Sequence, residues 1–564
     1  MEVLSVLRTN VLVVGGGAAG MFAAIYAARQ GAQVILLDKN TVGRGGATVM
    51  AQMTCASALG EVEPDSPELH LRDTLDAGRG LCNEKLATLL CHGSPRLIRE
   101  LASWNVDWAR QHSGKINQVT APGHGRKRCV YVDYLRTGAA ICEALRLQVS
   151  HDSGIRVLNN VCVTDIVTRE GELIGAVGFD IATSGLLTVQ ANAVILCSGG
   201  MMKMFQRTTA PNNNSGDGLG IALRAGAQLI DIEFLQFYPN GHLAPRMVGL
   251  DPTTWEPTRV KLGGRLINGQ GEEFLSKYDA HADQGYTTTR DLLTHAIYWE
   301  VAAGRGSPHG GVYLSFQHIP AADIERALGP ALNIFARNNI DLTKRPVEVF
   351  PIAHYQMGGI EVNPSMETCI PGLYAAGEIV GGANGANRLS GNALPEAMVF
   401  GACAGERAGK STKNKLIPAW PTHIGAPHLD TIRQVRERRE AKGKAPTHML
   451  GELKEIMWKK VGAFRTADEL VEARKRISAM RHTELDELTI PAETIHNISL
   501  VEWFELRSGL QAAEAVAVAG LNRRESRGAH QRLDFPEISD DYRTNQRIWL
   551  ADGEISSSFE KCLS

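Results

Sequence analysis

The segment Asn10–Lys39, NVLVVGGGAAGMFAAIYAARQGAQVILLDK, constrains the fold of this chain more than any other stretch. It begins with an apolar run, Val11–Val14, that suits a buried parallel strand. A G-x-G-x-x-G motif follows, and the alanine-rich residues Met21–Arg29 predict a helix. A second apolar run, Gln33–Leu37, predicts the next strand and is followed by Asp38. A strand, a glycine turn, a helix and a second strand in this order predict a nucleotide-binding α/β fold.

Each glycine of the motif has its own physical role. Gly15 permits the tight turn, Gly17 lets a pyrophosphate approach the backbone, and Gly20 lets the helix pack closely on the strand. The helix N-terminus offers free N–H groups and the positive end of its dipole to the phosphates. Asp38 lies 18 residues after Gly20, where an acidic side chain would bond a ribose hydroxyl. The segment therefore predicts a dinucleotide site, but it does not distinguish NAD from FAD.

Composition excludes several classes of function. The 564 residues predict two to four domains, and a hydrophobic content of 44% with 21% charged residues is ordinary for a globular protein. A formal net charge of −2 provides no field that would attract nucleic acid or an anionic membrane. We expect no transmembrane helix, since apolar runs are short. Because the first strand begins by about residue 10, we also expect no signal peptide.

The cysteines indicate the redox environment. None of the ten forms a C-x-x-C pair, which argues against an iron–sulfur or zinc site, and we predict no metal site in this chain. Scattered cysteines in a large nucleotide-binding chain favour a reducing cytoplasm. Association with a membrane would then require a partner protein.

The remaining sequence predicts an inserted domain and a helical C-terminal part. Residues 69–104 form a helical pattern with expected breaks near Gly78–Gly80 and Pro95, and the polar residues 251–319 indicate an insertion. The prolines of residues 416–429 predict a linker, and residues 525–536 have an irregular pattern. Further helices are predicted over 137–149, 430–444, 454–485 and 501–524, and further strands over 155–170, 173–179, 193–196, 264–268, 312–316, 347–363 and 373–378.

Several further motifs occur in one recognisable order. They are Gly123-His124 with Arg126 and Arg128, Ser215-Gly216-Asp217-Gly218, Gln236-Phe237-Tyr238-Pro239, His354-Tyr355 before Met357-Gly358-Gly359, Gly377-Glu378, Gly385-Ala386-Asn387-Arg388-Leu389, and the block Glu525–Pro536. On these motifs the chain resembles the flavoprotein subunit of succinate dehydrogenase and fumarate reductase, a family that includes L-aspartate oxidase. The resemblance spans nearly the whole chain.

The resemblance implies an α/β fold with three parts. A Rossmann-like FAD-binding domain is expected over residues 1–243 and 347–415, an inserted α+β capping domain over 244–346, and a C-terminal helical domain over 430–564. It also implies that FAD is the cofactor and that a small dicarboxylate lies against the flavin. Hydride would pass between flavin N5 and one carbon of the substrate's central bond.

Three residues would hold and convert the substrate, by this resemblance. Arg290 matches the catalytic arginine of the capping domain, and His354 and Arg388 match the carboxylate clamps. Guanidinium groups suit this role because they pair with carboxylates in a planar, bidentate way. Since the pKa of arginine exceeds about 12, such a proton donor works only as part of a relay. Glu256 and Arg259 have the spacing of the family's relay, although a one-residue gap must follow them and a structural ion pair is the competing interpretation.

The chain departs from the family at three positions. Ala47 occupies the place of the histidine that carries covalent FAD, and no histidine precedes His70, so we expect non-covalent FAD. Tyr238 occupies the usual histidine position of a carboxylate clamp. A tyrosine donates a hydrogen bond but carries no positive charge near neutral pH, so one carboxylate would be held more weakly or replaced by another group. Leu262 stands where relatives often have a glutamate, which would alter the proton path.

The resemblance also assigns the residues that hold FAD. For the ADP half these are Gly15, Gly17, Ala18, Gly20, Asp38 and Lys39, and for the ribityl and ring half they are Thr48, Asp217, Glu378, Asn392 and Leu394.

The sequence thus predicts an FAD-dependent oxidoreductase that interconverts saturated and α,β-unsaturated carboxylates, first of all succinate and fumarate. An iron–sulfur partner would carry the electrons. L-aspartate oxidase is the rival enzyme, and peroxide release with aspartate would favour it. Two further candidates are adenylylsulfate reductase-like chemistry and a non-enzymatic electron carrier with a decayed site, and the retained Arg290, His354 and Arg388 argue against decay.

Overall fold

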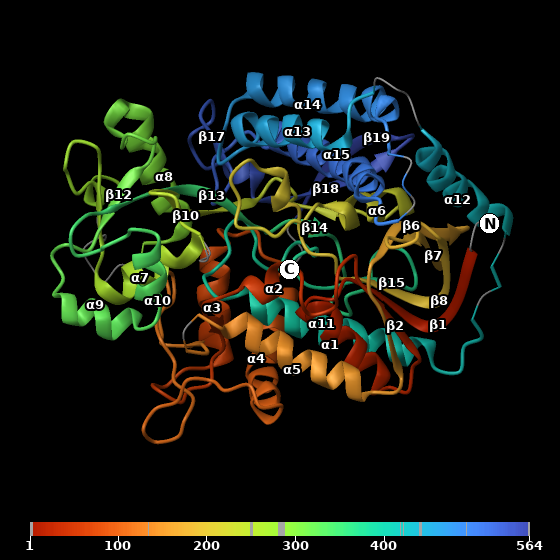
Figure 1. Cartoon of the computed structure of the whole chain (residues 1–564), viewed down its shortest axis with the longest axis horizontal. Helices are drawn as coiled ribbons and strands as arrows, with labels where there is room; N and C mark the ends of the chain where they lie inside the picture. Colours follow the sequence, from red (N-terminus) through yellow and green to blue (C-terminus); the bar gives the residue numbers. More distant parts are fainter. Residues whose placement is uncertain are drawn as a thin grey trace.

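The computed structural model describes residues 4–561 except 134, 249–251, 280–287, 418, 421, 439–442, 492 and 494. Its central sheet has the strand order β5-β2-β1-β8-β7-β6, and β15 pairs with the carboxyl end of β8 (Figure 1). The strands are β1 (Leu4–Val14), β2 (Val34–Leu37), β5 (Ile155–Leu158), β6 (Val161–Arg169), β7 (Glu172–Asp180), β8 (Leu186–Leu196) and β15 (Leu373–Ala375). The predicted strand–turn–helix–strand unit is present, with β1 and β2 parallel and α1 (Ala18–Ala28) between them.

Helices lie on both faces of this sheet. On one side α1 packs against α11 (Ala393–Thr412), and on the other α6 (Asp217–Ala225) packs against α15 (Ile498–Asn522) (Figure 1). The contact of α1 with α11 depends on glycine, because a Cβ on Gly401 or Gly405 would lie 2.3 or 2.2 Å from the carbonyl oxygen of Ala19 or Ala23. This close approach directs the N-terminus of α11 toward the glycine turn. The same part of the fold contains α2 (Gly46–Met50), β3 (Cys55–Ala56), α3 (Pro67–Ala77), α4 (Glu84–Ser103), β4 (Cys129–Val130) and α5 (Thr137–His151).

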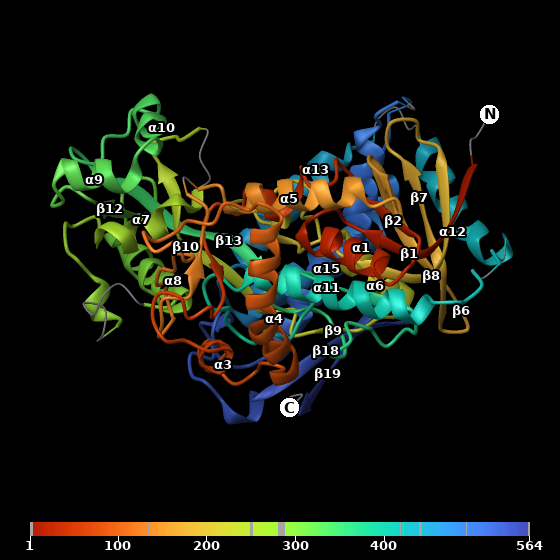
Figure 2. The same cartoon turned by 90° about the horizontal axis from the view of Figure 1, so that it is seen from below.

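The inserted segment folds around a core of its own. In this core the Trp255 ring stacks on the Phe335 ring, with centroids 5.1 Å apart. Its elements are β10 (Leu235–Ala244), α7 (Trp255–Leu262), β11 (Arg265–Ile267), α8 (Arg290–Glu300), β12 (Val312–Ser315), α9 (Ala321–Leu328), α10 (Ala331–Arg337) and β13 (Val347–Gln356). Four of them form the sheet β10-β13-β12-β11, and the whole unit, here called the cap, projects from one end of the molecule (Figures 1 and 2). The cap core includes Val347 and Val349, which lie just after the predicted domain boundary at residue 346. The domain boundaries themselves stay predictions.

The C-terminal part combines helices with strands. Its helices are α12 (Thr422–Glu437), α13 (Pro446–Lys460), α14 (Ala467–His482) and α15, and its strands are β16 (Phe464–Arg465), β17 (Gln531–Arg532), β18 (Thr544–Ala551) and β19 (Glu554–Lys561). The final hairpin joins β9 (Leu229–Ile230) and β14 (Gly359–Ile360) of the nucleotide-binding part in one sheet. The predicted helical C-terminal domain is confirmed, and residues 525–536 contain little regular structure besides β17. The hairpin of β18 and β19 was not predicted.

Two predictions based on proline are wrong. The linker expected over residues 416–429 overlaps α12, whose Pro427 is accommodated while Ile432 and Val435 are fully buried; Pro418 and Pro421 lie outside the described residues. The helix α4 continues through Pro95, where a break was expected. Proline cannot donate to the carbonyl oxygen of Cys91, and the Ser94 hydroxyl donates to it instead at 3.3 Å. The predicted break at Gly78–Gly80 is confirmed, since α3 ends at Ala77.

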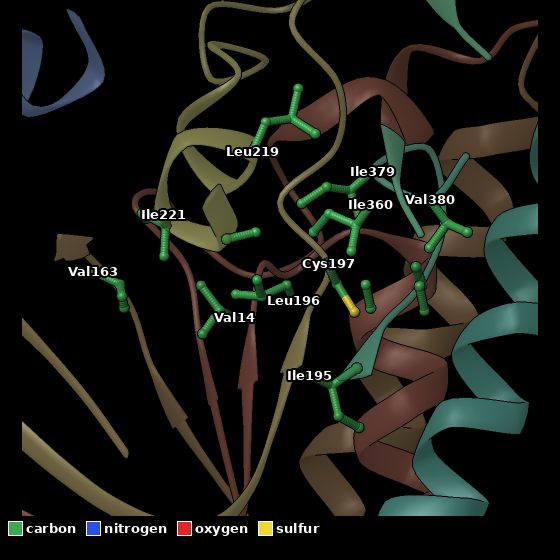
Figure 3. Close-up of a cluster of buried hydrophobic side chains, with 14 of the residues drawn as sticks. Val14, Val163, Ile195, Leu196, Cys197, Leu219, Ile221, Ile360, Ile379 and Val380 are labelled. Atoms are coloured by element: carbon green, nitrogen blue, oxygen red, sulfur yellow. The ribbon is translucent and has the colours of Figure 1, made fainter. Parts of the chain in front are cut away.

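Apolar side chains fill the space beneath the glycine turn. Figure 3 shows Val14, at the end of β1, beside Leu196, the last residue of β8, with Cys197 directly after it. These side chains are buried, and they hold the ends of the two strands at one edge of the sheet. This edge is the place where an open α/β sheet binds its ligand. Among the described helices, none combines the length and the apolar composition needed to cross a bilayer.

Candidate functional site

A cavity of about 1050 Å³ lies between the nucleotide-binding part and the cap. One end is formed by the turn after β1, by α2 and by the end of β8. The middle is formed by residues 376–378 with Arg388, Ser390, Gly391, Ala393 and Leu394, and the far end by residues of the cap. Nine of the eleven predicted FAD residues and five of the six predicted substrate or catalytic residues line this cavity directly. They are Gly15, Gly17, Ala18, Asp38, Lys39, Thr48, Asp217, Glu378 and Leu394 in the first group, and Tyr238, Glu256, Arg290, His354 and Arg388 in the second.

The glycine turn has the geometry that its sequence predicts. Gly15 has φ +110°, and a Cβ there would lie 2.3 Å from the carbonyl oxygen of Cys197. Gly20 does not line the cavity; it lies behind the turn, where a Cβ would meet the Gly15 carbonyl oxygen at 1.8 Å. The Thr48 hydroxyl accepts from the backbone N–H of Ala18 at 3.1 Å. Gly20 therefore shapes the turn by close packing. Gly15, Gly17 and Ala18 line the space that a pyrophosphate would occupy.

Asp38 fixes the position of this turn. Its Oδ2 accepts from the backbone N–H of Gly16 at 2.6 Å, and its Oδ1 accepts from that of Asn40 at 2.7 Å. The carboxylate is buried at the end of β2 and lines the cavity. Its predicted bond to a ribose hydroxyl stays a prediction.

Lys39 belongs to a buried ion cluster beside the nucleotide site. Its ammonium lies 2.8 Å from Asp217 Oδ2 and 2.6 Å from Glu505 Oε1, and Lys203 lies 2.7 Å from the other oxygen of Glu505. Burial alone would lower the pKa of Lys39, but the two carboxylates outweigh it and raise the pKa. Lys39 therefore stays charged and connects the nucleotide site to α15.

Several residues that line the cavity have buried polar atoms without a hydrogen-bond partner among the described residues. Asn214 Oδ1, Asp217 Oδ1 and Ser198 Oγ are buried and make no hydrogen bond with the described residues. Glu378 accepts from the backbone N–H of Gln356 and from Asn214 Nδ2, both at 3.2 Å, and burial raises the pKa of its carboxyl. These groups suit the hydroxyls and ring heteroatoms of a flavin nucleotide, so the residues present fit the predicted cofactor.

Asn392, predicted to help hold the ribityl and ring half of FAD, does not line the cavity. It precedes α11, but its Oδ1 lies 2.8 Å from His70 Nε2 and its Nδ2 donates to Thr74 Oγ1 at 3.1 Å. The side chain thus points away from the cavity, which its neighbour Leu394 lines. The backbone at the start of α11 is the part of this region that could meet a flavin ring, through its free N–H groups.

Arg290 and Arg388 converge on one side chain at the cap end of the cavity. Gln236 Oε1, on β10, accepts from Arg290 Nη1 at 3.2 Å and from Arg388 Nη2 at 2.9 Å. Arg290 also pairs with Glu256 of α7, with Nη2 and Oε2 2.7 Å apart. Burial alone would lower the pKa of Arg290, but Glu256 more than compensates, and the pKa is raised. Arg290 is therefore a fixed cation whose partner is on the same cap.

Arg388 is buried, and no carboxylate of the residues that the structure describes forms an ion pair with it. Its guanidinium lies over the Tyr355 ring, 4.2 Å from the centroid, and the Tyr355 hydroxyl donates to Glu396 Oε2 at 2.7 Å. Burial, together with the charge of Arg290, lowers the pKa of Arg388 to about 10. Burial also raises the pKa of Glu396 to about 7. The Arg388 charge is therefore only weakly compensated before an anion binds.

His354 and Tyr238 lie side by side next to Arg290. Their ring centroids are 5.2 Å apart, and the guanidinium carbon of Arg290 lies 5.0 Å from the centre of the Tyr238 ring. His354 Nδ1 lies 2.8 Å from the Thr209 hydroxyl. Burial and the two arginine charges lower the pKa of His354 well below its ordinary value. This histidine therefore offers a neutral hydrogen-bonding ring.

The predicted relay residues are only partly assembled. Glu256 contacts Arg290, whereas Arg259 is buried one turn further along α7 and does not line the cavity. Leu262, the last residue of α7, is partly buried against the cap core. The relay role of Arg259 thus stays a prediction.

The sequence assigned no role to several residues that support this site. They are Gln236, Thr209, Tyr355 and Glu396, together with Arg79, whose Nη2 donates to Asp291 Oδ2 at 2.8 Å and ties the start of α8 to the nucleotide-binding part. Gln236 and Tyr355 had a signal, since they belong to the Gln-Phe-Tyr-Pro and His-Tyr motifs. Thr209 and Arg79 had none, because their partners are 145 and 212 residues away.

Comparisons with known proteins agree with this geometry. Residues 10–394 match the family described as FAD binding domain, and residues 451–561 match the family described as fumarate reductase flavoprotein C-term. The chain belongs to the succinate dehydrogenase and fumarate reductase flavoprotein family. It is therefore an FAD-dependent oxidoreductase of this family, and the predicted fold class is confirmed.

Individual relatives extend over nearly the whole chain. One subunit of the fumarate reductase (CoM/CoB) of Methanothermobacter marburgensis is 34% identical over 95% of this chain and 96% of its own length. L-aspartate oxidase of Streptomyces coelicolor is 32% identical over 95% of this chain and 90% of its own length. The solved structure of E. coli quinol fumarate reductase FrdA is 28% identical, with a TM-score of 0.92 and coverage of 99% and 97% of the two chains.

The cavity predicts how FAD is attached. Ala47 lines it at α2, and His354 is the one histidine among its described lining residues. We therefore expect acid precipitation of the holoprotein to release the FAD into the supernatant, measured by its absorbance. Flavin that stays with the precipitate after washing would show a covalent bond and contradict this expectation.

Proposed function

We propose that the protein interconverts a saturated and an α,β-unsaturated carboxylate, with fumarate and succinate as the first pair to test. The observation that supports this most is the pairing of Arg290 with Glu256 beside the separate cation Arg388, both arginines facing Gln236 at the cap end of the cavity. A fixed proton donor and a spare buried cation are what reduction of such a double bond requires.

The residues can divide the reaction as follows. FAD, when bound, supplies or accepts the hydride. Arg388 binds the carboxylate of the substrate, and its charge stabilises the negative charge that develops on that carboxylate when hydride adds to the β-carbon. His354 adds a neutral hydrogen-bonding group beside it, held by Thr209.

Arg290 then completes the addition by donating a proton to the α-carbon. The new C–H bonds consume one hydride and one proton, and the double bond becomes a single bond. A neutral guanidine is a strong base, so Arg290 takes up a proton again, delivered through Glu256. This restores the ion pair between Arg290 and Glu256, whose closest atoms lie 2.7 Å apart.

A partner is proposed for the electrons. The fumarate reductase (CoM/CoB) relative is by its name one subunit of an enzyme. We propose an iron–sulfur protein as the electron partner here, to be sought by affinity purification from the native organism and by metal analysis of what is captured.

L-aspartate oxidase is the second candidate, because a relative of that name is 32% identical to this chain. The two functions differ in what oxidises the reduced flavin. In a steady-state assay with a reduced viologen dye under anaerobic conditions, the proposed function predicts dye oxidation on addition of an α,β-unsaturated carboxylate. Hydrogen peroxide formed from L-aspartate in air, without any dye oxidation by unsaturated acids, would favour the oxidase instead.

A further inference from the structure

Five cationic side chains among the described residues line the cavity, and four of them have partners already. Lys39 pairs with Asp217 and Glu505, Arg290 with Glu256, and Arg326 with Asp323 at 3.0 Å, while the exposed Lys261 donates to the carbonyl oxygen of Ala327 at 2.7 Å. Apart from the exposed Lys261, Arg388 is the one cation of this group that forms no ion pair with the carboxylates of the described residues; its nearby carboxyls, Glu378 and Glu396, both have raised pKa values. The site thus has one spare buried cation for a substrate charge.

Tyr238 does not provide a second charged clamp. Its hydroxyl donates to the carbonyl oxygen of Thr253 and accepts from the backbone N–H of Glu256 at 3.1 Å. The hydroxyl is therefore fixed to the start of α7, and the side chain is only 2% exposed. What this residue offers to the cavity is its ring, next to His354 and Arg290.

His354 does not supply the missing charge either. Burial and the charges of Arg290 and Arg388 lower its pKa and keep this ring neutral near pH 7. A dicarboxylate would therefore bury one carboxylate at Arg388 and the other against an aromatic ring and neutral hydrogen-bonding groups. An unpaired buried carboxylate is unfavourable, whereas an uncharged acyl group of the same shape loses little on entering such a site.

We propose that the preferred substrate is an α,β-unsaturated carboxylate with a single charge, whose other end is an uncharged acyl group such as an amide or an ester. This inference rests on the proposed function and names its substrate class. Arg388 binds the one carboxylate, Arg290 delivers the proton, and the uncharged end lies along Tyr238. One hydride and one proton are again consumed, because only the group at the far end of the double bond differs.

The test compares matched substrates on the same holoprotein. Fumarate, its monoamide and its monomethyl ester have the same double bond and differ in the charge at one end. In the anaerobic dye assay at pH 7.5, we expect kcat/KM for the monoamide and the monoester to exceed that for fumarate by about tenfold or more. Maleate, with both carboxylates on one side of the double bond, serves as the control for shape.

Two variants connect the preference to Tyr238. The substitution Tyr238→His places a ring N–H that can donate a hydrogen bond to a second carboxylate, and a bound carboxylate favours its protonation, so the ratio of kcat/KM for fumarate to that for the monoamide should rise above the wild-type ratio. Tyr238→Phe keeps the position uncharged, so this ratio should stay as in the wild type. FAD content and Tm of each variant establish that it is folded.

The outcomes are distinguishable. A kcat/KM for fumarate equal to or above that for the monoamide and monoester overturns the inference and leaves the proposed function standing. An unchanged ratio in folded Tyr238→His also overturns it. If none of the unsaturated acids oxidises the dye, the proposed function fails, and the inference fails with it.

Discussion

Replacing Arg290 by Gln is expected to lower kcat by about 10³- to 10⁴-fold, because a positioned proton donor contributes on the order of 10² to 10⁴ and Gln supplies no proton. The change also leaves Glu256 buried without its partner, and breaking a buried pair in this way costs about 3–5 kcal/mol of stability. Steady-state kinetics in the dye assay measure the first effect, and thermal unfolding of the holoprotein measures the second.

The two effects can be separated within the same site. The double substitution Arg290→Gln with Glu256→Gln removes both charges, so it should regain much of the lost stability while kcat stays low. Arg265→Gln is the matched control, since Arg265 is a half-exposed arginine of the same cap that pairs with Glu273. A near wild-type kcat of the Arg290→Gln variant would show that Arg290 is not the proton donor.

Replacing Gly15 by Ala is expected to abolish stable FAD binding. The new Cβ would lie 2.3 Å from the Cys197 carbonyl oxygen at φ +110°, so β1 and β8 must separate where they support the pyrophosphate. We expect FAD affinity to fall by about 100-fold or more, equivalent to about 2.7 kcal/mol. FAD retained after gel filtration, and its dissociation constant by fluorescence titration of the apoprotein, provide the measurement.

Gly31 offers the matched control for backbone strain. It has φ +85°, and no atom lies within 4 Å of the position of its Cβ. Gly31→Ala therefore carries the cost of a left-handed conformation, about 1 kcal/mol, without the clash, and it should retain its FAD. Equal loss of FAD from both variants would show that strain, and not the contact with Cys197, governs the turn.

The sequence predicted the nucleotide-binding half because its information is local. Glycine spacing, an apolar strand and an alanine-rich helix specify one geometry within about 30 residues, and Gly15, Gly17, Ala18 and Asp38 all lie where that geometry places them. The contacts of the Asn392 side chain could not be predicted in this way, because His70 and Thr74 come from a helix more than 300 residues earlier.

The substrate end could be predicted only as a set of separate residues. Motif resemblance identified Arg290, His354 and Arg388, but the bridge through Gln236 and the Glu256 contact depend on how the cap folds over the sheet. Proline misled the prediction twice, at Pro95 and Pro427, because buried apolar faces of the helices outweighed a local preference. Strand β18 was missed although its signal is local, because the Asp552-Gly553 turn pairs it along its length with β19. Only its two-residue pairing with β9 is distant in sequence.

The central claim is that bound FAD exchanges hydride with a carbon–carbon double bond next to a carboxylate held by Arg388. A single-turnover experiment tests it most directly. The holoprotein is photoreduced without oxygen and mixed in a stopped-flow instrument with fumarate, its monoamide or its monoester, and the products are quantified. The prediction is that the absorbance of oxidised flavin returns with one equivalent of saturated acid formed per FAD. Flavin that stays reduced with every one of these acids, while oxygen reoxidises it, would contradict the claim.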